Sequence, residues 1–96
     1  MGYFLRDADK NLIPVGLSMR IGSDPGSDIV IKEKDVAVCH AIIGTFPDGL
    51  LIRDEESQSG TFVNDEKITQ VTALVSGDQI LIGKTRFVVY YDHTEI

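Results

Sequence analysis

The sequence predicts an all-β fold, a β-sandwich built from many short and mostly antiparallel strands. Short runs of β-favouring apolar residues recur along the chain, and turn-forming residues separate them every six to twelve positions. No stretch places apolar residues at i, i+3 and i+4 over the length of a helix. The chain has 96 residues, of which 43% are hydrophobic and 25% charged, which suits one globular domain. We therefore expect a single domain over residues 1–96, with its core between residues 3 and 91.

In the first half of the chain, turn-forming residues delimit the expected strands. The polar segment 6–11 is typical of a hairpin turn, and the Gly- and Asp-rich segment 22–28 is typical of a longer loop. Pro14 and Gly16 indicate a bend or a sheet edge, because proline cannot donate a hydrogen bond to a neighbouring strand. Residues 32–35 are a charged loop. The expected strands are residues 3–5, 12–15, 17–21, 29–31 and 41–46.

The second half of the chain repeats this alternation of strands and turns. Pro47-Asp48-Gly49 is a strong turn signal and predicts a hairpin. The polar segment 54–60 lies between two apolar runs, so it predicts a displayed loop of the kind that carries binding residues. Gly83-Lys84 predicts a two-residue hairpin turn. The expected strands are residues 50–53, 61–63, 79–82 and 85–91, with a brief strand starting at Ile68 after a tight turn at 64–67, and with residues 72–76 leading to a turn at Gly77-Asp78.

Charge and cysteine content limit the partners and the compartment. The net charge of −6 argues against nucleic acid and anionic membrane surfaces, because both reward clustered Lys and Arg. No apolar run approaches the roughly 18 residues needed to cross a membrane, and no basic-then-apolar leader is visible, so we expect no membrane insertion of this segment. The single cysteine, Cys39, excludes an internal disulfide and fits a reducing compartment. We therefore expect a cytoplasmic location, including that of a cytoplasmic domain in a membrane-anchored protein.

Three segments have some features of catalytic or ligand-binding motifs. Cys39 and His40 are adjacent on an extended segment, so their side chains point apart and cannot readily form a nucleophile–base pair. Residues 77–85 nearly match a nucleotide-binding P-loop, but they have five residues between the glycines instead of four and no helix follows. The acids at 54–56 are too closely spaced for a hard-cation loop. We therefore expect no enzyme activity, no cofactor and no metal.

Several short motifs, in order and at compatible spacing, resemble the forkhead-associated (FHA) family across nearly the whole chain. They are Ile21-Gly22 and residues 28–31 at the family's opening Gly-Arg loop, residues 36–41 at its Ser-x-x-His segment, residues 54–64 at its Asp-x-x-Ser-x-Asn-Gly-Thr-Phe-Val-Asn loop, and residues 77–80 and 82–83 at its closing Gly-Asp and Ile-Gly pieces. The resemblance implies a sandwich of about eleven strands, whose loops at one end hold a phosphothreonine peptide.

The resemblance also assigns the peptide site, and three of its positions depart from the family pattern. Where the family has an Arg that reaches the phosphate, this chain has Ser23. A phosphate-binding Ser is replaced by Ala37, and an Asn that holds the peptide backbone is replaced by Ser59. Four positions match the family: His40 and Gly60, which shape the loops, and Ser57 and Thr61, which the resemblance places as polar groups near the peptide.

The resemblance therefore implies a non-enzymatic protein–protein interaction module with a degenerate phosphothreonine pocket. Phospho-motif readers depend on Arg clusters, and these loops have none. FHA-like domains that lack such residues occur in bacterial secretion machines, including the cytoplasmic part of a type III secretion inner-membrane ring protein, so a larger signalling or secretion assembly is an expected parent. The expected partner is a protein or peptide, bound either through other surfaces or as an unphosphorylated segment, and self-association stays open. The alternative is a working phosphothreonine reader in which Lys32 or Lys34 replaces the missing Arg.

Overall fold

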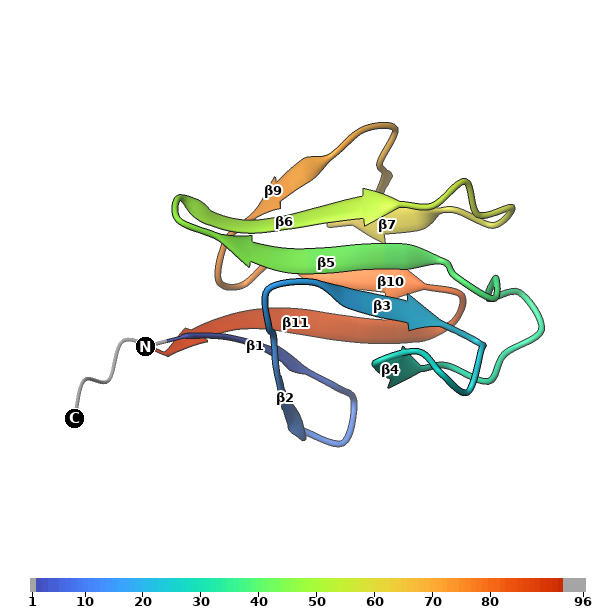
Figure 1. The fold of residues 1–96 in the computed structure, drawn as a ribbon, viewed down its shortest axis with the longest axis horizontal. Helices are drawn as coiled ribbons and strands as arrows, with labels where there is room; N and C mark the ends of the chain where they lie inside the picture. Colours follow the sequence, from blue (N-terminus) through green and yellow to red (C-terminus); the bar gives the residue numbers. More distant parts are fainter. Residues whose placement is uncertain (1, 93–96) are drawn as a thin grey trace.

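The computed structural model describes residues 2–92, which form eleven strands in two facing sheets (Figure 1). The six-stranded sheet has the order β2-β1-β11-β10-β7-β8, and the five-stranded sheet has the order β4-β3-β5-β6-β9. This confirms the predicted all-β sandwich. No helix long and apolar enough to cross a membrane occurs in the described part of the chain. The strands are β1 (Gly2–Arg6), β2 (Leu12–Pro14), β3 (Met19–Gly22), β4 (Ile29–Val30), β5 (Ala41–Phe46), β6 (Gly49–Asp54), β7 (Thr61–Val63), β8 (Glu66–Lys67), β9 (Thr72–Leu74), β10 (Gln79–Ile82) and β11 (Thr85–Asp92).

Hairpins build most of both sheets. β5 and β6 pair antiparallel over their full lengths, from Ala41↔Asp54 to Phe46↔Gly49. β10 and β11 join through Gly83, whose φ of +62° lies in the left-handed region that glycine adopts at little steric cost. β1 pairs with β11, which brings the two ends of the described chain side by side (Figure 1). Among the pairings of the described strands, only β3 with β4 is parallel.

The core lies between the two sheets and follows from the two-residue period of the strands. In β5 and β6, alternate residues such as Ile43 and Ile52 point inward, while their neighbours Ile42 and Leu51 point outward. Each fully buried Ile, Leu or Phe contributes roughly 1.5–3 kcal/mol of hydrophobic free energy. The buried apolar residues are Leu5, Ile21, Ile29, Ile31, Val36, Ala41, Ile43, Leu50, Ile52, Leu74, Ile80, Ile82, Phe87 and Val89.

Two expected strand positions are wrong. A strand was expected to start at Ile68 after a tight turn over 64–67, but β8 is Glu66–Lys67 and lies within that supposed turn. The reason is that Asn64 and Asp65 make the turn alone, with φ of 51° and 69°, as Asn and Asp readily do in two-residue hairpins. β3 begins at Met19 rather than at residue 17, and Leu17 is 84% exposed. The other expected strands differ from the observed bounds by at most one residue at either end, and β9 occupies only residues 72–74 of the segment 72–76 that leads to the next turn.

The connections β3–β4, β4–β5 and β6–β7 all lie at one end of the sandwich, on the right in Figure 1. Gly22 lets two of them meet, because a Cβ at this position would lie 2.1 Å from the Val38 carbonyl oxygen. Any larger residue would force the β4–β5 connection away from the end of β3. The fold therefore brings the three loops that carry the predicted site residues together.

Candidate functional site

The first two predicted positions, Ser23 and Ala37, lie side by side at the loop end. The Ser23 amide donates a hydrogen bond to the Ala37 carbonyl oxygen over 2.9 Å. The Asp24 amide donates in the same way to Val38, over a longer 3.4 Å. Val38 itself is 67% exposed. The positions at which the FHA pattern has a phosphate-binding Arg and Ser are thus adjacent, but they present a short hydroxyl and a methyl group.

His40 joins the β4–β5 loop to the β6–β7 loop from inside the protein. Its ring is completely buried. The Ala37 amide donates to Nδ1 over 3.1 Å, and Nε2 lies 2.8 Å from the Gly60 carbonyl oxygen. Because an amide can only donate and a carbonyl can only accept, these partners specify a neutral ring with its proton on Nε2. His40 therefore shapes the loops, as the resemblance implied.

Asp54 organises the β6–β7 loop through its carboxylate. Oδ1 accepts hydrogen bonds from the hydroxyl groups of Ser57, at 2.5 Å, and Thr61, at 2.7 Å, while Oδ2 accepts from the Ser57 amide at 3.0 Å. Partial burial alone would raise the pKa of Asp54, but the two hydroxyl groups and the amide outweigh it and hold the pKa below its ordinary value. Asp54 is thus a structural acid whose carboxylate is engaged within the protein.

The same network engages Ser57 and Thr61, the two hydroxyl groups that were expected near the peptide. Thr61 is fully buried, and its hydroxyl donates to Asp54. The Ser57 hydroxyl donates to Asp54 and also accepts from the Gly60 amide over 3.0 Å. Both side chains therefore hold the loop in shape and have little remaining capacity to bind a ligand.

Ser59, the third departing position, is also bound within the protein. Its hydroxyl donates to the Asp35 carbonyl oxygen over 2.6 Å and so links the β6–β7 loop to the β4–β5 loop. Beside this link is a shallow hollow of about 270 Å³. Lys34, Ala37 and Gln58 line it together with Asp35, Val36 and Ser59. Of the two lysines proposed as substitute cations, the structure brings Lys34 to this hollow, whereas Lys32 does not line it.

The sequence reasoning did not single out Gln58 or the position of Lys67. Gln58 is exposed and lines the hollow. In the sequence, only its position between two serines of the loop indicated that it could contact a ligand. The stem of Lys67 covers Gly60, since a Cβ at Gly60 would lie 2.7 Å from Cε of this lysine. Gly60, with φ +89°, is therefore favoured by its backbone conformation, whereas the flexible Lys67 side chain could move away from a Cβ.

Glu33 ties the β4–β5 loop to the β10–β11 hairpin. Its Oε1 accepts from the Lys84 amide over 2.8 Å, and its Oε2 accepts from the Thr85 hydroxyl. The hydroxyl and the amide are the main reasons why the pKa of Glu33 lies below its ordinary value. This acid is therefore engaged within the protein, as Asp54 is.

The loop end is acidic overall. The loop segments 23–28, 32–40 and 55–60 contain six carboxylates and two lysines, and they contain no arginine. A phosphothreonine carries about −1.5 to −2 charges at neutral pH, so it would meet net repulsion here. The three segments provide backbone groups and small hydroxyl groups, and Arg53, which borders segment 55–60, donates to Glu55 of the same loop.

The loops also lack the parts of a catalytic or metal site. Cys39 is partly exposed, but the nitrogens of the neighbouring His40 already bond to backbone groups, so the ring is not placed to act as its base. Within residues 2–92, no group of three or more His, Cys, Asp or Glu side chains is arranged to hold a metal ion. The P-loop-like segment 77–85 lies at the β10–β11 hairpin and has no helix for a phosphate to bind.

Comparison with known proteins gives a family match and a curated relative. The model of the FHA domain family matches residues 19–83. The chain is 39% identical over 71 residues to the ABC transporter ATP-binding/permease protein Rv1747 of Mycobacterium tuberculosis (strain ATCC 25618 / H37Rv). The aligned region covers 74% of this chain but only 8% of the transporter, so the similarity concerns one small part of that protein.

Solved structures agree with this assignment. The NMR-based structure of the FHA-2 domain from the Mycobacterium tuberculosis ABC transporter Rv1747 is 38% identical and has a TM-score of 0.67, covering 80% of this chain and 69% of that one. Mycobacterium tuberculosis EmbR, in complex with a low affinity phosphopeptide, is 27% identical with a TM-score of 0.91, covering 99% of this chain and 26% of that one. The family match extends over most of the chain and the strand arrangement agrees, so the chain belongs to the FHA family of protein-interaction domains.

Proposed function

We propose that this FHA domain binds an unphosphorylated protein or peptide and that its phosphothreonine pocket has degenerated. One observation carries the proposal: Ser23, Ala37 and Ser59 replace the groups that would hold the phosphate and the peptide backbone. The remaining hydroxyl groups support it, since Ser57 and Thr61 bond to Asp54 and Ser59 bonds to Asp35. The loop frame of a phosphate reader is present, whereas its ligand-binding side chains are absent.

The expected loss of affinity is large compared with the modest affinities of this family. An Arg–phosphate contact contributes roughly 1.5–3 kcal/mol, and a neutral hydroxyl contact contributes about half of that. Losing both removes on the order of 2–4 kcal/mol, which corresponds to a tens- to several-hundred-fold weaker complex. The acidic rim adds repulsion to this loss.

The relatives suggest the kind of protein to which the domain belongs. Rv1747 is an ABC transporter ATP-binding/permease protein, and the chain resembles an FHA segment within it. We infer a cytoplasmic domain of a larger membrane-associated protein, in either a transport or a secretion assembly. Its role there is to hold a partner protein, without catalysis, cofactor or metal.

A restoration experiment tests the degenerate pocket. The wild-type chain and the triple variant Ser23→Arg, Ala37→Ser, Ser59→Asn are titrated with a phosphothreonine peptide library and with the same peptides unphosphorylated. We expect phosphate-dependent binding for the triple variant alone. Sub-millimolar, phosphate-dependent binding by the wild-type chain would contradict the proposal.

A second candidate function, an altered phosphothreonine reader, is favoured by one observation only. Lys34 lines the hollow beside Ala37 and Gln58, where it could meet a phosphate. This alternative predicts phosphate-dependent binding by the wild-type chain that Lys34→Ala weakens and that Lys32→Ala leaves unchanged. If Lys34→Ala has no effect on such binding, Lys34 is not the substitute cation.

A further inference from the structure

The outer face of the five-stranded sheet is apolar and is covered by no other described part of the chain. Figure 1 views the molecule with this sheet in front of the other. Outward residues of β5 and β6 include Ile42, Phe46 and Leu51, and Ala73 of β9 continues the row across the sheet. Four large apolar residues on or beside this face are each more than half exposed: Leu17, Phe46, Val71 and Val75. Scattered exposed apolar residues are normal, but a contiguous group indicates an interaction surface.

The face is hollowed in a way that suits an inserted side chain. One hollow of about 300 Å³ has Ile42, Gly44 and Leu51 among its lining residues. A second hollow of about 560 Å³ shares Phe46 and Leu51 with it and continues around the β5–β6 hairpin to Tyr3 of the six-stranded sheet. Gly44 is required here, because a Cβ would lie 2.3 Å from the Leu17 carbonyl oxygen. We call the first hollow, together with the outward residues Phe46 and Ala73 beside it, the sheet groove.

The first hollow is lined by one cation, Arg53, and by no carboxylate, although the whole chain has a net charge of −6, whereas Asp48 lines the second hollow. The register places Arg20, Ile42 and Arg53 in one row across β3, β5 and β6. The two arginine Cα atoms are therefore about 10 Å apart, which is twice the strand spacing. Arg20 forms none of the described ion pairs, although its backbone amide donates to Oδ2 of Asp28 over 2.8 Å, which places one carboxylate beside it.

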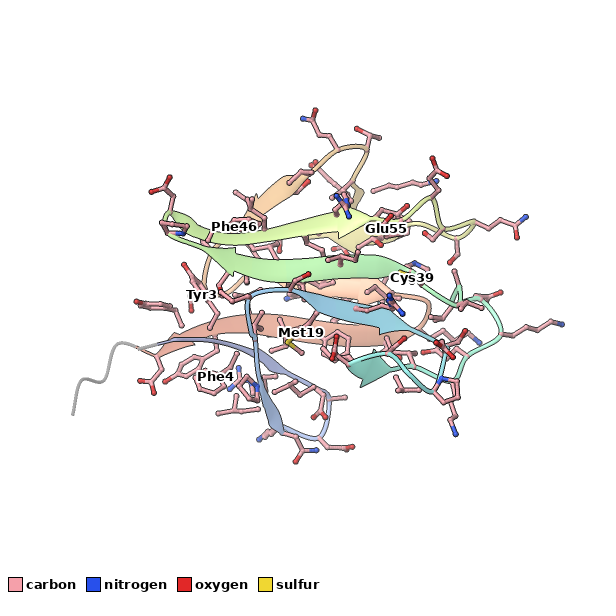
Figure 2. All side chains as sticks on the ribbon, in the orientation of Figure 1. Tyr3, Phe4, Met19, Cys39, Phe46 and Glu55 are labelled. Carbon is pink, nitrogen blue, oxygen red and sulfur yellow. The ribbon has the colours of Figure 1, made fainter. Side chains whose placement is uncertain are left out.

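Arg53 keeps donors free despite its contact with Glu55. Its Nε and Nη2 both donate to Oε1 of Glu55, at 2.9 and 2.6 Å, and none of the described hydrogen bonds uses Nη1. This pair is exposed, and exposed ion pairs contribute about 0–1 kcal/mol, so it does not prevent a second carboxylate from binding. Phe46 and Glu55 lie toward opposite ends of this side of the molecule (Figure 2).

We propose that the sheet groove docks a segment of another protein that carries apolar side chains flanked by Asp or Glu. The apolar side chains fill the first hollow beside Leu51, and the carboxylates bind the Arg20 and Arg53 row. A second copy of this chain fits less well, because the first hollow of that copy would present Arg53 and no carboxylate. The inference concerns a surface away from the loops, so it does not depend on whether they bind phosphate.

Peptide selection followed by NMR mapping tests this inference. Random linear peptides displayed on phage are selected against the wild-type chain, and the enriched peptides are titrated into the ¹⁵N-labelled chain. We expect enriched peptides with apolar residues and carboxylates, which shift the amide signals of β5, β6 and β9. Arg20→Glu and Phe46→Ser should each weaken binding by about tenfold or more, as removal of an interface anchor does. The matched controls Arg6→Glu and Tyr90→Ser, on strands of the other sheet, should leave binding unchanged.

Four outcomes would overturn the inference: no enriched peptide, peptides without carboxylates, signal shifts confined to the loops or the six-stranded sheet, or equal weakening by the control variants. Sedimentation of the wild-type chain adds a further test, since dimerisation that Phe46→Ser abolishes would identify a second copy as the occupant and contradict the proposed partner. A negative result of the peptide selection does not affect the phosphothreonine titrations. The docking proposal and the degenerate-pocket proposal can therefore be refuted separately.

Discussion

The loop end and the sheet groove differ in how their side chains are used. At the loop end, His40, Asp54, Ser57 and Thr61 bond to one another or to the backbone. On the sheet groove, Leu17, Phe46 and Val71 project from the surface, each more than half exposed. The loop residues that match the FHA pattern therefore serve the fold first, whereas the groove residues are not needed to hold the sandwich together.

This difference explains why a motif can persist without its ligand. Ser57, Gly60 and Thr61 are sufficient to build the β6–β7 loop around Asp54, and none of them needs a phosphate for that role. Ser23 and Ala37, by contrast, occupy positions where the fold uses only backbone groups. Side chains at such positions can change without altering the conformation of the loops. A loop motif is thus stronger evidence for the fold than for the ligand.

Removing the His40 ring should give the largest effect and tests whether the loops are structural. His40→Ala leaves a cavity and removes the acceptor of the Ala37 amide and the donor to Gly60, so we expect a loss of about 3 kcal/mol in the free energy of unfolding. Urea denaturation measures it. Phe46→Ser on the sheet groove should change stability by only about 0.5 kcal/mol. Equal losses for the two variants would contradict the contrast between the regions.

Asp54→Asn should give a smaller loss, of roughly 1–3 kcal/mol at neutral pH, because hydrogen bonds from Ser57 and Thr61 to a charged acceptor are weakened. The pKa of Asp54 is lower in the folded chain than in the unfolded chain. Its contribution is therefore complete above the unfolded pKa of about 3.9 and is lost as the pH falls through the lowered folded pKa. Thermal unfolding of wild type and variant between acid and neutral pH measures this. Their stability difference should shrink as the solution is acidified, and a difference that stays constant would exclude Asp54 as its source.

The strands were predictable from the sequence because turn formers delimit them sharply. Pro47 and Asp48 delimit β5 from β6, and Gly83 separates β10 from β11. The exceptions are local: Asn64 and Asp65 made a tighter turn than expected, so β8 began earlier than Ile68. When several turn-forming residues follow one another, as in segment 64–67, the sequence does not specify which two of them adopt positive φ and form the turn.

The site was less predictable than the fold, because hydrogen-bond partners are not visible in a sequence. The resemblance placed Ser57 and Thr61 near a peptide, but Asp54 accepts both hydroxyl groups. Lys32 and Lys34 were equivalent in the sequence, and only the path of the loop brings Lys34 to the hollow. The sheet groove was also invisible, since its members come from separate strands that only the register brings into one row.

The smallest expected effect concerns Glu33, whose contacts attach the β4–β5 loop to the β10–β11 hairpin. Glu33→Ala removes both acceptors, so the Lys84 amide should exchange with solvent faster, while the buried core amides of β10 keep their protection. Glu33→Gln is the matched variant, because its amide oxygen can accept from Lys84 and its NH₂ group can donate to Thr85. Hydrogen exchange followed by NMR should therefore separate the two, with fast exchange for the alanine variant only. Fast exchange in both would mean that the negative charge of Glu33, and not its hydrogen bonds, holds the loop to the hairpin.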